Sequence, residues 1–166
     1  MSRGFVKEED QEEPLIIPPR AAIPEGVTNY VTQNGMEELR KELKELEHER
    51  ADVQAENETE KRREQSLIDG KINLLKERLN TARLLTPEEQ PKDEVRFGAH
   101  VKLNNLETGQ KQEFQIVGVD EADIKKKKIA FVAPIAKAVT GKKMGDKVDF
   151  KLGNEVRKLK ILSISY

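Results

Sequence analysis

The sequence predicts an α+β protein in which an antiparallel two-helix coiled coil precedes a small antiparallel sheet with one short helix. Two apolar heptad seams, separated by a polar stretch, indicate the helix pair. Alternating and β-branched segments after residue 91, separated by turn residues, indicate the sheet. A long helical finger buries little surface for its length, so we expect its tip to carry function.

The finger is predicted over residues 35–86. Between its seams, from Gln54 to Gln65, only Ala55 is apolar, which places the turn within Glu56–Glu60 by the symmetry of the two halves. Arg50 fills the one gap in the first seam. The first seam comprises Met36, Leu39, Leu43, Leu46 and Val53, and the second comprises Ile68, Ile72, Leu75, Leu79 and Ala82.

Local signals set the ends of the two helices. Thr32 is a suitable N-cap for the first helix, and Thr86-Pro87 is expected to end the second. Each arm is about 20 residues, or about 30 Å. Gly70 lies inside the second helix, where it costs about 1 kcal/mol relative to Ala. We interpret it as allowing close approach of the first helix.

Residues 1–34 are predicted to be an extended, disordered N-terminal extension. Their acidic cluster and four prolines leave too little apolar surface to offset the entropy of ordering. The short apolar segment Leu15–Ile17 leaves open a second possibility, in which the extension packs on the rest of the protein. The acidic cluster comprises Glu8, Glu9, Asp10, Glu12 and Glu13.

Residues 91–166 are predicted to form the sheet domain. One short helix is expected from Pro134 to Val139, because Pro suits a helix start and Gly141 follows its end. The predicted strands are Val95–Leu103, Glu113–Val119, Ile129–Val132, Lys147–Leu152 and Lys158–Ile164.

Composition narrows the class of protein. The 166 residues include no cysteine, no apolar run long enough to span a membrane and no recognisable secretory signal. We therefore expect the protein to be cytoplasmic and not to associate with a membrane. Residues 84–166 hold sixteen basic and twelve acidic groups, a net +4 within a chain of net −1. This permits an acidic partner without requiring nucleic acid. Polar Arg50 and Asn57 at seam positions favour one intramolecular register, and hence a monomer.

Several stretches together resemble the Gre transcript-cleavage factors, GreA and GreB. In the finger these are Gly35–Leu39 and Leu79–Leu85. In the sheet domain they are Phe97-Gly98-Ala99, Phe114–Gly118, Asp120-Glu121-Ala122-Asp123 and Pro134–Ala138. The resemblance covers residues 35–166 and keeps the order of the family's two domains.

The resemblance implies an FKBP-like C-terminal domain and a bacterial transcription elongation factor that is not itself an enzyme. Such a factor docks at the rim of the secondary channel of RNA polymerase. Its coiled coil enters the channel, where tip carboxylates help to hold a second Mg²⁺ and orient the water that cuts backtracked RNA. The Mg²⁺ belongs to the polymerase, so the factor needs no cofactor or metal of its own. It meets RNA and DNA only indirectly, within the elongation complex.

The resemblance also assigns candidate residues. Glu56, Glu58 and Glu60 correspond to the tip carboxylates. The tip lacks the family's aromatic residue and the arms look one to two turns shorter, so two roles stay open. Either the glutamates assist the metal, or they are a solvated turn on a regulator that occupies the channel without stimulating cleavage. The predicted docking residues are Pro134, Ile135, Ala136, Asp120 and Glu121, with a simple helix start as the alternative for Pro134.

The sequence disfavours two other classes of function, a prolyl isomerase and a pure interaction module. Prolyl isomerisation uses an aromatic-lined pocket, whereas this chain has no Trp, two Tyr and five Phe, of which Tyr30 and Phe5 lie outside the sheet domain. A pure interaction module would pair its coiled coil with another helix, which the polar seam positions disfavour. The elongation factor is therefore the function that the sequence favours.

Overall fold

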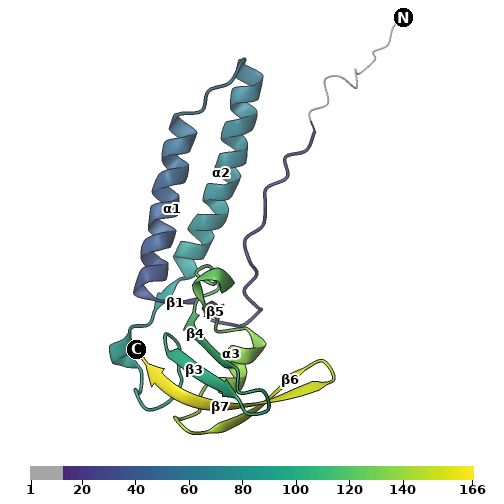
Figure 1. The fold of residues 1–166 in the computed structure, drawn as a ribbon. Helices are drawn as coiled ribbons and strands as arrows, with labels where there is room; N and C mark the ends of the chain where they lie inside the picture. Colours follow the sequence, from purple (N-terminus) through teal and green to yellow (C-terminus); the bar gives the residue numbers. More distant parts are fainter. Residues whose placement is uncertain (1–12) are drawn as a thin grey trace, which may run out of the picture.

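A computed structural model describes residues 13–166; the cluster from Glu8 to Glu12 lies outside this range. Two antiparallel helices, α1 (Gln33–Ala51) and α2 (Glu58–Thr81), stand on a curled sheet domain (Figure 1). The two predicted parts, a helical finger and a sheet domain, are thus both present. Within residues 13–166, no helix is long and apolar enough to cross a membrane.

Helix α1 begins where its N-cap predicts. The Thr32 hydroxyl accepts a hydrogen bond from the Gly35 amide at 2.9 Å, which satisfies one of the helix's free N–H groups. Helix α2 ends at Thr81, five residues before the predicted stop at Thr86-Pro87. The earlier end has a physical cause, because Ala82 becomes extended and the chain enters a two-residue strand, β2 (Arg83–Leu84).

Strand β2 pairs in parallel with β1 (Tyr30–Val31), at the base of the finger. The pair is held by hydrogen bonds from the Arg83 amide to the Asn29 carbonyl and from the Leu85 amide to the Val31 carbonyl. Two residues are too few to show an alternating pattern, so neither strand could be predicted from the sequence. The pair joins the start of α1 to the end of α2.

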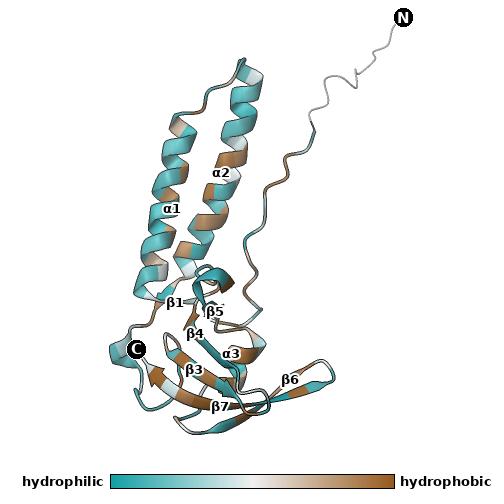
Figure 2. Cartoon of the chain, viewed as in Figure 1, coloured by the Kyte–Doolittle hydropathy of each residue, from teal (hydrophilic) through white to brown (hydrophobic). Residues whose placement is uncertain are grey.

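The helix seams pack as the heptads predict. Leu39 and Leu75 are buried between the helices, with Met36, Leu43 and Leu79 packed around them. Helix α1 is mostly hydrophilic in Figure 2, whereas α2 shows several hydrophobic stretches. The finger is therefore a thin two-helix layer with one apolar seam between the helices, and Leu67 and Leu74 of α2 line hollows on its surface.

The sheet domain has strand order β5-β4-β3-β7-β6. All pairs are antiparallel except β4–β5, which is parallel and corrects the fully antiparallel prediction. The segment between these strands contains a 3₁₀ turn, η3 (Ile124–Lys126), and Lys127 in a left-handed conformation, so it crosses back before β5 starts. The strands are β3 (His100–Asn105), β4 (Lys111–Val117), β5 (Lys128–Ala130), β6 (Lys147–Leu152) and β7 (Glu155–Ser165).

Two of the predicted segments match closely and one does not. The short helix α3 (Pro134–Val139) and strand β6 have the predicted bounds. The strand predicted from Val95 starts only at His100, because Gly98 has a positive φ of 89° and turns the chain. A second 3₁₀ turn, η2 (Pro87–Glu89), lies between the finger and the sheet domain.

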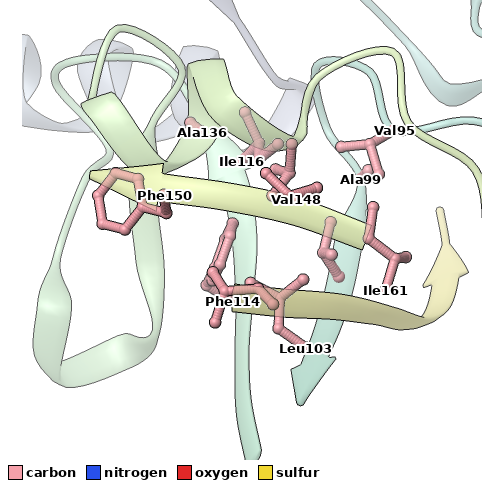
Figure 3. Packing of buried hydrophobic residues seen from close by; sticks show 12 residues of the cluster. Val95, Ala99, Leu103, Phe114, Ile116, Ala136, Val148, Phe150 and Ile161 are labelled. Atoms are coloured by element: carbon pink, nitrogen blue, oxygen red, sulfur yellow. The ribbon is translucent and has the colours of Figure 1, made fainter. Parts of the chain in front are cut away.

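One hydrophobic core fills the sheet domain. Side chains from the inner sheet face meet Ala136 and Val139 of α3 (Figure 3). Leu103, Ala136 and Ile161 are fully buried. The remaining buried members of this cluster are Val95, Ala99, Val101, Phe114, Ile116, Val148, Phe150 and Leu159.

Candidate functional site

The tip of the finger is the segment of residues 52–57 together with the first turn of α2. The turn was predicted at Glu56–Glu60 but lies earlier, because Asn57 caps α2. Its side-chain oxygen accepts a hydrogen bond from the Glu60 amide at 2.9 Å. Glu58 and Glu60 therefore belong to the first helical turn, where their charge favours the positive end of the helix.

The three predicted tip carboxylates, Glu56, Glu58 and Glu60, are all solvent-exposed. Within residues 13–166, no group of three His, Asp or Glu side chains is arranged to hold a metal ion. Because they face solvent, the three carboxylates are accessible to another molecule without rearrangement of a buried network.

The predicted docking residues of α3 differ in accessibility. Pro134 is exposed at the first helical position, Ile135 is half-buried against the domain core, and Ala136 is fully buried. A surface hollow beside Pro134 and Ile135 is also lined by Leu152 and Arg157 of the β6–β7 hairpin. A partner can reach Pro134 and the edge of Ile135 directly, whereas Ala136 only supports them.

The Asp120 carboxylate lies where the finger meets the sheet domain. Its side chain is 7% exposed and forms ion pairs with Arg20 at 3.1 Å and with Arg78 of α2 at 3.2 Å. Arg20 also binds the Glu42 carboxylate of α1 through both terminal nitrogens, at 2.7 and 3.0 Å. These contacts raise the pKa of Arg20, mainly through the hydrogen bonds to Glu42.

The neighbouring Glu121 carboxylate, 2% exposed, binds the start of α1. It accepts hydrogen bonds from the Thr32 hydroxyl, from Asn34 at 3.0 Å and from the Lys128 ammonium at 3.0 Å. A Cβ at Gly35 would lie 2.7 Å from its Oε1 atom, so only glycine fits there without displacing the carboxylate. Asp120 and Glu121 are thus engaged within the chain, and of the five predicted docking residues only Pro134 and Ile135 are accessible from solvent.

An aromatic cluster completes the attachment of the finger. The Tyr30 ring of β1 packs against Phe97 and Phe131 of the sheet domain, with centroid distances of 6.0 and 5.8 Å, and the two Phe rings lie 5.6 Å apart. A Cβ at Gly118 would lie 2.5 Å from the Tyr30 carbonyl oxygen, so β1 passes directly over this glycine. This attachment was not predicted, although glycines inside or beside regular elements, here Gly35 and Gly118, often mark the close approach of another segment.

Known proteins identify the class to which this finger and sheet domain belong. Residues 90–166 match the family model "Transcription elongation factor, GreA/GreB, C-term". A transcription elongation factor GreA of Neisseria meningitidis is 40% identical over 113 residues, which cover 68% of this chain and 71% of the relative. That of Thermodesulfovibrio yellowstonii is 37% identical over 105 residues, 63% and 66% of the two chains. The aligned part thus spans about two thirds of each relative.

Two solved structures were also matched. The GreA factor homolog 1 of Thermus thermophilus is 21% identical with a TM-score of 0.40, covering 84% of this chain and all of that one. A GreA/GreB elongation factor of Nitrosomonas europaea is 20% identical with a TM-score of 0.42, covering 84% and 99%. On the strength of its sequence relatives, the chain belongs to the GreA/GreB family of transcription elongation factors.

Proposed function

We propose that this protein is an accessory elongation factor that places the tip of its finger in the secondary channel of bacterial RNA polymerase and promotes cleavage of backtracked RNA. The observation that carries the proposal is the exposed acidic tip, with Glu56, Glu58 and Glu60 at the far end of a finger whose longer helix has 24 residues. At 1.5 Å per residue this helix is about 36 Å long. Such a finger can deliver carboxylates to a site deep inside a partner.

The proposed chemistry belongs to the polymerase. A carboxylate brought to about 2 Å from a Mg²⁺, or acting through one bound water, adds negative charge that helps to retain the metal. A second metal then stabilises the attacking and leaving oxygens of the phosphodiester that is cut. The factor is therefore a supplier of ligands, acting in the cytoplasm on the elongation complex, and meets nucleic acid only within that complex.

Transcript cleavage by a stalled, backtracked elongation complex tests this proposal. The wild-type chain is compared with a variant carrying Glu56→Gln, Glu58→Gln and Glu60→Gln, which removes three charges and keeps side-chain size. The matched control carries the same three-charge change on exposed shaft positions: Glu47→Gln, Glu49→Gln and Glu77→Gln. We expect the tip variant to lose stimulation and the shaft variant to keep it.

Two other outcomes would change the conclusion. If wild type stimulates no cleavage but competes with a GreA protein for the polymerase, it is a channel-occupying regulator, the second candidate that the missing tip aromatic favours. If it neither stimulates cleavage nor binds polymerase, the proposal is overturned.

The docking part of the proposal is tested separately with Pro134→Asp. Position 134 is exposed and begins α3, where an acidic residue is compatible with the helix start. The substitution leaves Ile135 in its place against the core. We expect binding to polymerase to weaken at least tenfold, with an unchanged unfolding midpoint. Unchanged affinity would remove Pro134 from the docking surface.

A further inference from the structure

The segment of residues 13–21, here called the N-terminal strap, lies extended alongside the finger and reaches the sheet domain (Figure 1). Its three prolines, Pro14, Pro18 and Pro19, restrict the backbone to extended conformations and lower the entropy lost when it docks. Disorder and packing on the protein were both open possibilities for this region. In the structure it contacts the rest of the protein at Glu13, Ile17 and Arg20, whereas Ile16 stays exposed.

The strap is matched in length to the helix beside it. At its start, the Glu13 carbonyl accepts a hydrogen bond from Arg63 at 2.8 Å, and at its end the Ala21 carbonyl accepts one from Arg78. These two arginines are 15 residues apart on α2, or about 22 Å. Eight extended steps of about 3.1 Å span about 25 Å. The strap thus runs nearly straight between two anchors on one helix.

In its middle, the strap packs on Gly70 of α2. A Cβ added at Gly70 would lie 1.9 Å from Ile17 Cδ1 and 2.7 Å from Ile17 Cγ1, well inside contact distance. This corrects the prediction that Gly70 accommodates the first helix, because the close neighbour is the strap. Glycine is a poor helix former, and the seat for Ile17 is the structural reason for its presence here.

Near its C-terminal end, the strap connects three elements through one side chain. Arg20 binds Glu42 on α1 with a two-pronged contact and Asp120 of the sheet domain with its Nε atom. Arg78 of α2 binds the other oxygen of Asp120. The strap and α2 therefore meet on one nearly buried carboxylate of the sheet domain, and Arg20 connects α1 to it through Glu42. Planar guanidinium groups suit such fixed, directional bridges better than an ammonium group does.

We propose that the N-terminal strap is a positioning element that fixes the direction of the finger relative to the sheet domain, with Arg20 as its main positioning residue. A finger attached by a two-residue strand pair, one small aromatic cluster and a polar interface can tilt about its base. The strap removes that freedom by tying α1, α2 and the sheet domain together. The consequence for function rests on the proposed function, because only a finger of fixed direction delivers its tip to a distant site while the domain stays docked.

A distance measurement on the free protein tests the strap without any polymerase. The chain has no cysteine, so spin labels can be placed only at Thr59→Cys near the tip and Lys102→Cys on β3, both exposed. We expect a single narrow distance distribution in the parent and a clearly broadened or shifted one in Arg20→Ala. Arg62→Ala, an exposed arginine near the tip, is the matched control and should leave the distribution unchanged.

A second variant avoids touching any charge. Gly70→Ala improves the helix but removes the seat of Ile17, so it should release the strap from a finger that remains folded. Trypsin can cut after Arg20, and we expect this cleavage to become at least fivefold faster in Gly70→Ala. Combining it with Ile17→Ala, which shortens the clashing side chain, should restore part of the protection.

The outcomes separate this proposal from the proposed function. An unchanged distance distribution in both Arg20→Ala and Gly70→Ala would overturn the positioning role, whatever the protein does to polymerase. A broadened distribution supports it even if the tip glutamates prove inactive. With polymerase added, we expect the affinity of Arg20→Ala for polymerase to stay within about threefold of wild type. Its tip-dependent stimulation of transcript cleavage should fall at least tenfold. If a strap variant with an unchanged distance distribution lost as much of the tip-dependent effect, the proposed link between finger direction and function would be contradicted.

Discussion

The finger and the sheet domain differ in how many buried side chains stabilise them. The sheet domain surrounds a continuous core of side chains from the sheet and α3. The finger has a narrow seam between two helices, and its buried side chains within residues 13–166 are those of Leu39, Ile68, Ile72 and Leu75, with Val31 of β1 at the base. The sheet domain is thus stabilised by its own core, whereas the direction of the finger depends on the polar and aromatic contacts at its base.

The largest effect is expected from removing core volume in the sheet domain. Ile161 is fully buried, so Ile161→Ala should lower the free energy of unfolding by about 3–4 kcal/mol, from lost burial and the cavity left behind. The half-buried seam residue Leu43 offers the comparison in the finger. Leu43→Ala should cost only about 1–2 kcal/mol. Urea denaturation followed by circular dichroism measures both, and equal losses would contradict the contrast between the regions.

The next effect concerns the attachment between the two regions. Asp120→Asn keeps the shape of the side chain but removes the charge that faces Arg20 and Arg78, whose side chains are 19% and 13% exposed. Leaving two partly buried guanidinium groups without their shared partner should cost about 2–3 kcal/mol, somewhat less than for a fully buried pair. Asp149→Asn, at an exposed position of β6, is the control. A loss no larger than that of the control would show that the attachment lies elsewhere.

These two regions were also unequally predictable from the sequence. The heptad seams, the Thr32 cap, α3 and β6 were predicted correctly, because each depends on residues close together in the chain. The tip was misplaced by a few residues, because the symmetry of two seams does not register a capping residue such as Asn57. The candidate carboxylates could be named, but their accessibility could not.

What the sequence could not show is contact between distant segments. Asp120 and Glu121 were assigned to a partner, yet they bind Arg20, Arg78 and Thr32, which lie 42 to 100 residues away along the chain. Ion pairs of this kind leave no periodic pattern. The parallel pairing of β4 with β5 was missed for a similar reason, since alternation predicts a strand but not its direction.

A smaller loss of stability is expected when the hydroxyl of Tyr166, at the C-terminal end of the sheet domain, is removed. The Tyr166 hydroxyl donates to the Glu94 carbonyl at 2.8 Å and accepts from the Arg96 amide at 2.9 Å. Burial raises the pKa of Tyr166 above its ordinary 10.0, so the hydroxyl stays a donor throughout the neutral range. Tyr166→Phe should therefore cost about 1–2 kcal/mol, chiefly from the unpaired backbone groups. A thermal midpoint equal to that of the parent would mean that water replaces both bonds.

The smallest effect lies in the finger, at the one polar gap in its first seam. Arg50 donates hydrogen bonds to both oxygens of Asp69 on α2. These bonds hold the pKa of Asp69 below its ordinary 3.8. A carboxyl whose pKa is lower in the folded state stabilises that state above pH 3.8, and the contribution disappears as the pH falls through the depressed folded value. Both side chains are more than 40% exposed, so solvent and salt weaken the pair.

We therefore expect Asp69→Asn to lower the urea midpoint slightly at pH 7. The difference from wild type should start to shrink below pH 3.8, vanish below the depressed folded pKa, and shrink in 1 M salt. Glu47→Gln, an exposed change on α1, should leave the midpoint nearly unchanged. A polar pair inside an apolar seam fixes which residues face each other more than it adds stability. Arg50→Leu would complete the seam, so it should raise the stability of the finger while weakening the preference for one register. A stabilised variant that also stays strictly monomeric at high concentration would show that the seam needs no polar pair to specify its partner.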